Sequence, residues 1–243
     1  KAINNIESVR GRGYALSTLC TILAGIQQID LLQQATDVAL VVVDKVEEKY
    51  SRVQILSSIA HSFLKSGRTT QAGSVASKAL EIAESVEDPH TRLGVVSSVI
   101  DVMARLELKA EVLRVADKMQ SDFYRGSIQK DLAEALMRAG LAEEALSVAR
   151  EIKFARIRSL TLSTIAQLLA KSGRLEESLI TARQVEEDEE RASTLAFVAE
   201  AFAVAGQPEK ARQISYEIDD WYHQVSAQVA TANSWLNSNS EHS

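Results

Sequence analysis

The sequence contains few cysteines, glycines, prolines and aromatic residues. It has one cysteine, ten glycines and two prolines among 243 residues, and only 5% of its residues are aromatic. The single cysteine, Cys20, excludes an internal disulfide and indicates a reducing compartment, so we expect a cytoplasmic protein. Few turn-forming residues argue against a β-sandwich or barrel. No apolar run approaches the roughly 18 residues of a membrane span, so we expect no membrane association.

An excess of basic residues is also missing. The chain carries 27 Lys and Arg against 33 Asp and Glu, for a formal net charge of -6. This balance argues against a nucleic-acid-binding surface, which is normally basic. Hydrophobic residues make up 46% and charged residues 25%, which is typical of a folded globular chain.

An internal repeat is the clearest feature that is present. Three segments align without gaps at a spacing of 33 residues, and each begins with Arg. Going upstream, the same Arg recurs first at a spacing of 33 and then twice at 40. The repeat arginines are Arg12, Arg52, Arg92, Arg125, Arg158 and Arg191. A fixed period of this length is the signature of a repeat architecture.

Other positions, counted from each repeat arginine, follow the same period. Apolar residues recur at positions 4, 7, 8 and 11, which is one stripe of a helix. Position 15 is Gly67, Gly140, Gly173 or Gly206, with Gln27 and Glu107 as exceptions. A glycine here supplies the left-handed residue that ends a helix. A second apolar set at positions 20, 23, 24 and 27 predicts a second helix, so each repeat is expected to be a helical hairpin.

The step from 40 to 33 residues has a physical interpretation. Seven residues are close to two helical turns, so their insertion lengthens a helix by about 10 Å while nearly keeping its buried face in register. The sequence therefore predicts long second helices near residues 31–48 and 71–87, and shorter ones afterwards.

The pattern resembles the tetratricopeptide-repeat superfamily. The matching residues are the Leu/Ile-Ala pair, the large residue three later, the glycine at the turn and two small residues in the second helix. The clearest copy is Ile165-Ala166, Leu169, Gly173, Ser178 and Ala182. The usual closing proline and the bulky aromatic of the second helix are missing, so the chain looks like a divergent relative. The resemblance implies an all-α, right-handed α/α superhelix (solenoid) of about six helical hairpins.

The expected hairpins cover residues 12–223, and the remaining segments flank them. Their predicted bounds are 12–51, 52–91, 92–124, 125–157, 158–190 and 191–223. Residues 1–11 are expected to be the end of a preceding helix, 224–236 a terminal capping helix and 237–243 a disordered tail. The chain is expected to be a fragment of a longer protein, whose other domains are then candidate partners.

The resemblance further implies a concave groove lined by the first helices, which holds a peptide or a partner protein. Positions 9 and 13 of the first helices are polar and lie one turn apart. The candidate partner-binding residues there are His61, Lys65, Asp101, Arg105, Glu134, Arg138, Gln167, Lys171 and Glu200. We expect Asp101–Arg105 and Glu134–Arg138 to form i,i+4 ion pairs. Two interpretations remain open: an ordinary solvated helix face, or a mixed-charge groove with a basic row from Lys65 to Lys171 for an acidic or C-terminal peptide.

The repeat arginines allow two interpretations as well. Acidic residues precede most of them by three to five residues, as Asp122 precedes Arg125. We expect a ladder of Arg–carboxylate bonds that ties each hairpin to the next. The alternative is a row of free guanidinium groups that binds phosphates or carboxylates. Arg158, which lacks a nearby preceding acid, separates the two.

Catalytic patterns are absent from the sequence. The four histidines are scattered, Cys20 occupies a position that is Ala in most repeats, and no phosphate-binding glycine loop occurs. We therefore expect a non-catalytic protein-interaction module, an adaptor, scaffold or sensor segment, without cofactor or metal. The alternatives are a structural spacer or self-association unit, and an enzyme domain that uses a groove pocket around Asp101, Glu134 and His61.

Overall fold

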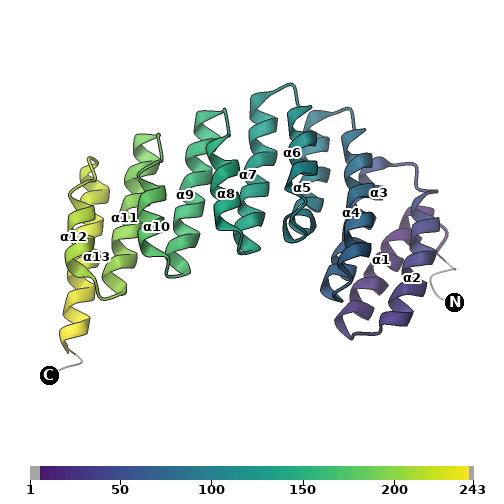
Figure 1. The fold of residues 1–243 in the computed structure, drawn as a ribbon, viewed down its shortest axis with the longest axis horizontal. Helices are drawn as coiled ribbons and strands as arrows, with labels where there is room; N and C mark the ends of the chain where they lie inside the picture. Colours follow the sequence, from purple (N-terminus) through teal and green to yellow (C-terminus); the bar gives the residue numbers. More distant parts are fainter. Residues whose placement is uncertain (1–5, 241–243) are drawn as a thin grey trace. The chain divides into compact units, whose positions relative to one another are not determined.

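A computed structural model gives the backbone of residues 6–240 and the side chains of residues 6–233. This part of the chain contains thirteen α-helices and no β-strand, which confirms the predicted all-α array of helical hairpins (Figure 1). The chain divides into two compact units, unit 1 (Lys1–Ala139) and unit 2 (Gly140–Ser243). Each unit is described by itself.

Unit 1 is built from seven helices. They are α1 (Val9–Gly25), α2 (Ile29–Val43), α3 (Lys49–Lys65), α4 (Thr69–Glu84), α5 (Pro89–Arg105), α6 (Lys109–Asp117) and α7 (Asp122–Arg138). The first helices α1, α3, α5 and α7 pack against one another in chain order, while α2, α4 and α6 each pack against their own first helix. The first helices therefore form one continuous layer in this unit.

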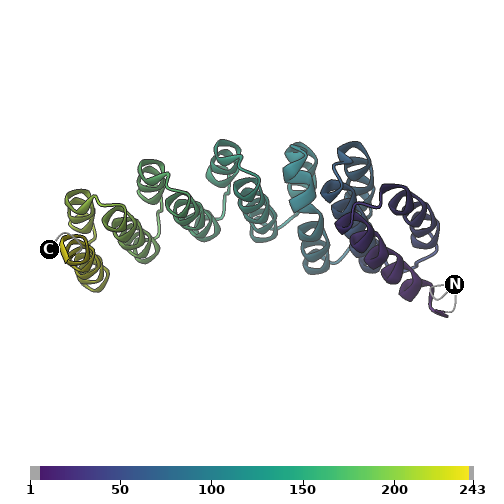
Figure 2. The ribbon, with the colours of Figure 1, turned by 90° about the horizontal axis from the view of Figure 1, so that it is seen from below.

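Unit 2 repeats the same arrangement with six helices. They are α8 (Ala142–Arg150), α9 (Ala155–Lys171), α10 (Leu175–Ala182), α11 (Asp188–Val204), α12 (Pro208–Ser215) and α13 (Trp221–Ser240). The first helices α9, α11 and α13 again pack in chain order, with α10 and α12 beside them. Figure 2 shows these two layers of unit 2 nearly end-on.

Second-helix length follows the repeat spacing, as predicted. Helices α2 and α4, which belong to the 40-residue repeats, have 15 and 16 residues. Helices α6 and α8 have 9 residues, and α10 and α12 have 8. The seven inserted residues thus add two turns to a second helix and leave the first helices α1 to α11 at 17 residues each.

The turn after each of these first helices contains one left-handed residue. The four glycines at position 15 have φ between 76° and 83°, and the two exceptions, Gln27 and Glu107, have φ of 58° and 59°. Tertiary packing therefore imposes the left-handed conformation even where the sequence does not supply glycine. A non-glycine residue in this conformation is strained by roughly 1–2 kcal/mol.

The core of each hairpin lies where the repeat pattern places it. Ile165 and Ala166 are fully buried, and so is Leu169, three residues later. The small residues of the second helix, Ser178 and Ala182, are fully buried too. Ser178 Oγ donates to the carbonyl oxygen of Ala166 at 2.7 Å, which joins the two helices of this hairpin. Small residues are needed here because they let the helix backbones approach closely.

The predicted boundaries differ from the structure at the N-terminal end. Each first helix begins three residues before the repeat position, so the repeat arginine lies in the first helical turn. Residues 1–11 were expected to end a preceding helix. Instead, Ile6 to Ser8 are not helical, and Ser8 Oγ accepts a hydrogen bond of 3.2 Å from the Gly11 N–H and caps α1. Residues 1–5 of that expected helix lie outside the described residues.

The C-terminal boundary differs as well. Helix α13 begins at Trp221 and continues to Ser240, whereas the sequence predicted a helix over 224–236 and a tail from 237. No Gly or Pro interrupts this segment, so nothing in it stops the helix earlier. Residues 241–243 of the expected tail lie outside the described residues.

Candidate interaction face and the repeat arginines

In unit 1, three successive first helices bring predicted site residues together around Asp101. Asp101 Oδ2 lies 2.9 Å from Arg105 Nε and 3.5 Å from His61 Nε2, and Asp101 Oδ1 lies 3.5 Å from Arg138 Nε. These residues come from α3, α5 and α7. The second ring nitrogen of His61, Nδ1, lies 3.0 Å from the carbonyl oxygen of Ser57. We call His61, Asp101, Arg105 and Arg138 the Asp101 cluster.

The cluster combines a half-buried acid with exposed bases. The Asp101 side chain is 26% exposed, whereas the side chains of Arg105 and Arg138 are 51% and 52% exposed. Two permanently charged guanidinium groups thus share one carboxylate, which leaves an excess of positive charge at an accessible surface.

One of the two predicted i,i+4 pairs forms and the other does not. Asp101–Arg105 is confirmed by the 2.9 Å contact. The prediction for Glu134 and Arg138 is wrong, because Arg138 reaches across to Asp101 on the neighbouring helix. Glu134 instead contacts Lys130 Nζ at 3.3 Å.

Lys130 is held in its charged form by these neighbours. Burial lowers the pKa of Lys130, but the nearby carboxylates of Asp131 and Glu134 outweigh burial, so the pKa is raised overall. Lys130, Asp131 and Glu134 form a separate group of charged residues on α7, beside the Asp101 cluster, and their charges pair with one another. Glu134 is therefore not joined to His61 and Asp101 in one acidic group, and no cluster of three His, Cys, Asp or Glu residues suited to a metal ion occurs in the described chain.

Lys65 extends the basic surface at the end of α3. Its ammonium group lies next to Gly25 at the end of α1, where an added β-carbon would be 3.5 Å from Nζ. Among the described residues Lys65 has no ion pair within reach. Like Arg105 and Arg138, it occupies the last turn of its helix, where the helix dipole favours a cation. The basic row of unit 1 therefore has a structural reason in addition to any binding role.

The predicted site residues of unit 2 do not converge. Gln167 Nε2 lies 3.4 Å from Ser163 Oγ on its own helix. Lys171 Nζ lies 5.8 Å from the centre of the Phe197 ring, at cation–π distance, and Glu200 is exposed on α11. Position 13 of α11 is Val204, 75% exposed, so the basic row ends at Lys171.

The repeat arginines bind backbone carbonyl groups at one fixed spacing, whereas their carboxylate partners lie at different spacings in the sequence. Four of them donate to the carbonyl oxygen of the residue six positions earlier. The pairs are Arg92 with Val86 (2.7 Å), Arg125 with Met119 (3.0 Å), Arg158 with Ile152 (2.5 Å) and Arg191 with Val185 (3.3 Å). Each acceptor follows the C-terminal end of a second helix. The guanidinium therefore caps the negative end of that helix, which the expected carboxylate ladder did not include.

Carboxylates supplement this contact in some repeats. Arg125 and Arg191 bind the acid three residues earlier on their own helix, at 2.7 and 2.5 Å. Arg52 lies 3.8 Å from Asp44. The Nε atoms of Arg12, Arg52 and Arg125 are buried without a hydrogen-bond partner among the described residues. The carboxylate contacts are thus variable, whereas the carbonyl contact recurs.

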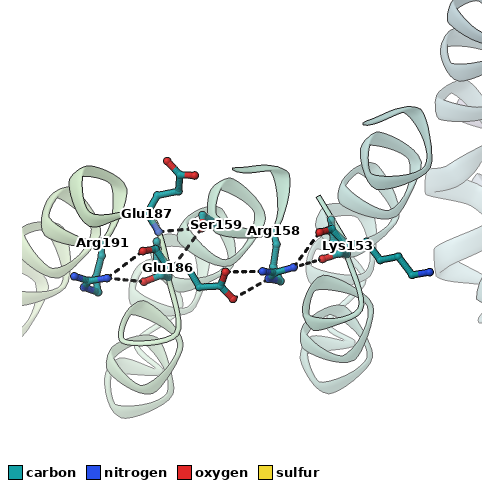
Figure 3. Close-up of polar contacts among 8 residues, drawn as sticks. Lys153, Arg158, Ser159, Glu186, Glu187 and Arg191 are labelled. Carbon is teal, nitrogen blue, oxygen red and sulfur yellow. Dashed lines mark hydrogen bonds and ion pairs between the residues drawn. The ribbon is translucent and has the colours of Figure 1, made fainter. Parts of the chain in front are cut away.

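Arg158 makes the most extensive contacts of the set (Figure 3). Besides Ile152, its Nε lies 3.0 Å from Glu186 Oε1, which belongs to the loop between α10 and α11. Hydrogen bonding to Arg158 lowers the pKa of Glu186. The N–H groups of Glu186 and Glu187 donate to Ser159 Oγ at 3.3 and 3.2 Å. Arg158 thus joins the end of α8 to the loop before α11. Its carboxylate partner, Glu186, follows the arginine in the sequence, whereas the predicted partners precede it.

The sequence contains one sign of the carbonyl contact, which is a hydrophobic residue that recurs at the acceptor position. The residue six positions before each repeat arginine is apolar in every repeat, and Val86, Met119, Ile152 and Val185 are all buried. Burial of these side chains fixes the backbone that carries the acceptor. The charge pattern of the sequence indicates carboxylate partners only, because every residue carries a main-chain acceptor and the sequence does not mark which one is used.

Comparisons with known proteins find only distant structural similarity. No family model matches the sequence, and no curated protein matches it significantly. The crystal structure of Ton1535 from Thermococcus onnurineus is 15% identical, with a TM-score of 0.33, over 94% of this chain and 81% of that one. The TPR-like repeats of a candidate kinesin light chain from Podospora anserina are 14% identical, with a TM-score of 0.42, over 91% of this chain and 98% of that one.

No helix in the described part of the chain combines the length and apolarity that crossing a bilayer requires.

Proposed function

We propose that the chain is a non-catalytic protein-interaction module that binds an acidic segment of a peptide or partner protein on the first-helix face of unit 1. The observation that supports it is the Asp101 cluster, in which Arg105 and Arg138, from neighbouring helices, share one carboxylate. Lys65 adds a further cation on the same layer. A helical-repeat array offers an extended surface of this kind for a partner.

The arginines of the Asp101 cluster can exchange the Asp101 carboxylate for one from a partner. Exposed ion pairs contribute only about 0–1 kcal/mol, so the contacts of Arg105 and Arg138 to Asp101 cost little to replace. A guanidinium group binds a carboxylate through two parallel N–H donors. An incoming Asp, Glu or C-terminal carboxylate can therefore take over one arginine while Asp101 keeps the other. In unit 2, we propose Gln167, Lys171 and Glu200 as separate contact residues for a partner.

The test measures binding of two labelled peptides by fluorescence anisotropy. One peptide is rich in Asp and Glu and has a free C-terminus. The other has Asn and Gln at the same positions and an amidated C-terminus. We expect the acidic peptide to bind more tightly, with an affinity that falls as salt is added. In the double variant Arg105→Gln, Arg138→Gln its affinity should fall about fivefold or more, since each exposed ion pair contributes up to about 1 kcal/mol.

A matched control separates a specific face from net charge. Lys45 and Lys153 are exposed basic residues outside the Asp101 cluster. The variant Lys45→Gln, Lys153→Gln changes the net charge equally and should leave the affinity unchanged. Equal binding of both peptides by the wild type, or equal loss in both variants, would contradict the proposal. No binding of either peptide would favour a structural spacer instead.

A further inference from the structure

His61 faces a hydrogen-bond acceptor with each of its two ring nitrogens. Nδ1 lies 3.0 Å from the carbonyl oxygen of Ser57, one turn earlier on α3. Nε2 lies 3.5 Å from Oδ2 of Asp101 on α5. A neutral imidazole carries one N–H, so one of its nitrogens then presents a lone pair to an oxygen atom. Only the protonated ring can donate toward both oxygens, so this geometry suits a histidine that gains a proton.

The charged groups around His61 come from two helices. Helices α1, α2, α4 and α5 pack against α3. Helix α5 supplies Asp101, which favours a positive charge on His61, and Arg105, which opposes it. Lys65, one turn further along α3, opposes it as well. Within the described part of the chain, no charged group of α1, α2 or α4 lies within ion-pair distance of His61, so Asp101 is the acid that a proton on His61 affects.

Asp101 has several basic neighbours to choose from. Nε of Arg105 lies 2.9 Å from Oδ2, the oxygen atom that also faces His61. Nε of Arg138 lies 3.5 Å from Oδ1. Arg105 is four residues away on the same helix, whereas Arg138 reaches Asp101 from α7 and makes the longer contact. Arg138 is therefore the partner that Asp101 gives up most readily.

We propose that protonation of His61 regulates binding of an acidic partner at the Asp101 cluster: the imidazolium ion pairs with Asp101, and Arg138 is released to bind a carboxylate of the partner. This inference rests on the proposed function of the same face. The proton comes from solvent, which reaches the His61 side chain because it is 44% exposed. Protonation also adds one positive charge to the face, which then attracts an acidic segment more strongly.

The pH range of the effect follows from the side chains involved. Histidine is the side chain whose charge changes between about pH 5 and pH 8. Asp and Glu of a flexible peptide stay ionised in this range, because their pKa values are about 3.9 and 4.3, and arginine stays charged. A change in affinity between pH 8 and pH 5.5 therefore does not come from the peptide or from the arginines. The coupling is reciprocal, so a bound acidic peptide also favours the proton on His61.

The test extends the peptide-binding measurement to a series of pH values. The acidic peptide carries a label that does not titrate in this range, and its binding is followed by fluorescence anisotropy from pH 8 to pH 5.5 at constant ionic strength. We expect the wild-type affinity to rise about three- to fivefold as the pH falls, which is the size of effect that one exposed ion pair allows.

Replacement of His61 makes the test specific. His61→Gln keeps a side chain that can form hydrogen bonds but cannot gain a proton, so its affinity at pH 5.5 should stay close to its affinity at pH 8. The control variant His90→Gln removes a histidine that is exposed in the first turn of α5, outside the Asp101 cluster. This control should keep the full rise in affinity. Circular dichroism checks that both variants keep their helices.

The two arginines of the cluster should respond differently to pH. Arg138→Gln removes the group that the proton releases, so binding should be weak at every pH and should not rise as the pH falls. Arg105→Gln should also weaken binding, but its affinity should still rise because Arg138 is present. The comparison identifies which arginine the protonation of His61 sets free.

The outcomes separate this inference from the proposed function. Wild-type protein that binds the acidic peptide equally at every pH, or a His61→Gln variant that keeps the rise, would overturn the role of His61 and leave acidic-peptide binding in place. A rise that persists in Arg138→Gln would overturn the release of Arg138. Absence of peptide binding at every pH would overturn the proposed function and this inference together.

Discussion

Arg158 donates to the carbonyl oxygen of Ile152, six residues before it, at 2.5 Å. The contact joins the first turn of α9 to the end of α8, and the same spacing recurs at Arg92, Arg125 and Arg191. A cation at a helix start opposes the dipole of its own helix. The unfavourable position is offset here because the guanidinium group lies at the negative end of the preceding helix.

Replacement of Arg158 tests this arrangement. Arg158→Gln should lower the free energy of unfolding by about 1–3 kcal/mol, because it removes charged hydrogen bonds to the Ile152 carbonyl and to Glu186. Urea denaturation followed by circular dichroism measures the change. Arg156→Gln, at an exposed arginine two residues away, should stay within about 0.5 kcal/mol of the wild type. Equal effects of the two variants would show that the contact contributes nothing.

Glu107 offers a stabilising substitution. It has φ of 59° in the turn after α5, where four other repeats have glycine. Glu107→Gly should raise the free energy of unfolding by up to about 1 kcal/mol, since glycine adopts this conformation without strain. The reverse change, Gly173→Ala, should lower it by a similar amount, although an added β-carbon there meets no atom within 4 Å. Thermal denaturation of the two variants should move in opposite directions.

Cys20 should react slowly in the folded protein. Its side chain is fully buried, with Sγ 3.5 Å from Thr36 Oγ1, and burial raises the pKa of its thiol. The reactive thiolate is therefore scarce as well as inaccessible. A thiol-specific reagent at neutral pH should modify the protein at the rate at which it opens, and quickly in denaturant. Fast modification of folded protein would contradict the packing of α1 on α2.

Glu84 should give unit 1 a pH-dependent contribution to stability. Hydrogen bonds from Lys118, which follows α6, and from Arg114 of α6 lower the pKa of Glu84 in the folded state. A carboxyl group with a depressed folded pKa stabilises the fold above its unfolded pKa, about 4.3, and this contribution is lost as pH falls through the folded pKa. Wild type should therefore exceed Glu84→Gln in stability at pH 7, and the difference should shrink below about pH 4. Denaturation of both proteins across this range checks the sign.

Much of the fold was predictable because the repeat period fixes which residues share a helix face. The buried pair at Ile165 and Ala166 and the long helices α2 and α4 follow directly from spacing. The partners of long side chains do not follow from the spacing, because a guanidinium group lies several bonds from the backbone and can reach more than one neighbouring acid. Arg138 pairs with Asp101 on the preceding first helix, α5, rather than with Glu134 on its own helix. The start of α1 depended on a side-chain cap at Ser8, which periodicity does not contain.

The six-residue spacing between four of the repeat arginines and their carbonyl acceptors also affects how the chain can fold during synthesis. Because the two groups are neighbours in the chain, the junction needs no distant segment to be present and closes only a short loop. A nascent chain can therefore complete each junction soon after the arginine leaves the ribosome. The hairpins can thus fold in the order in which they are translated.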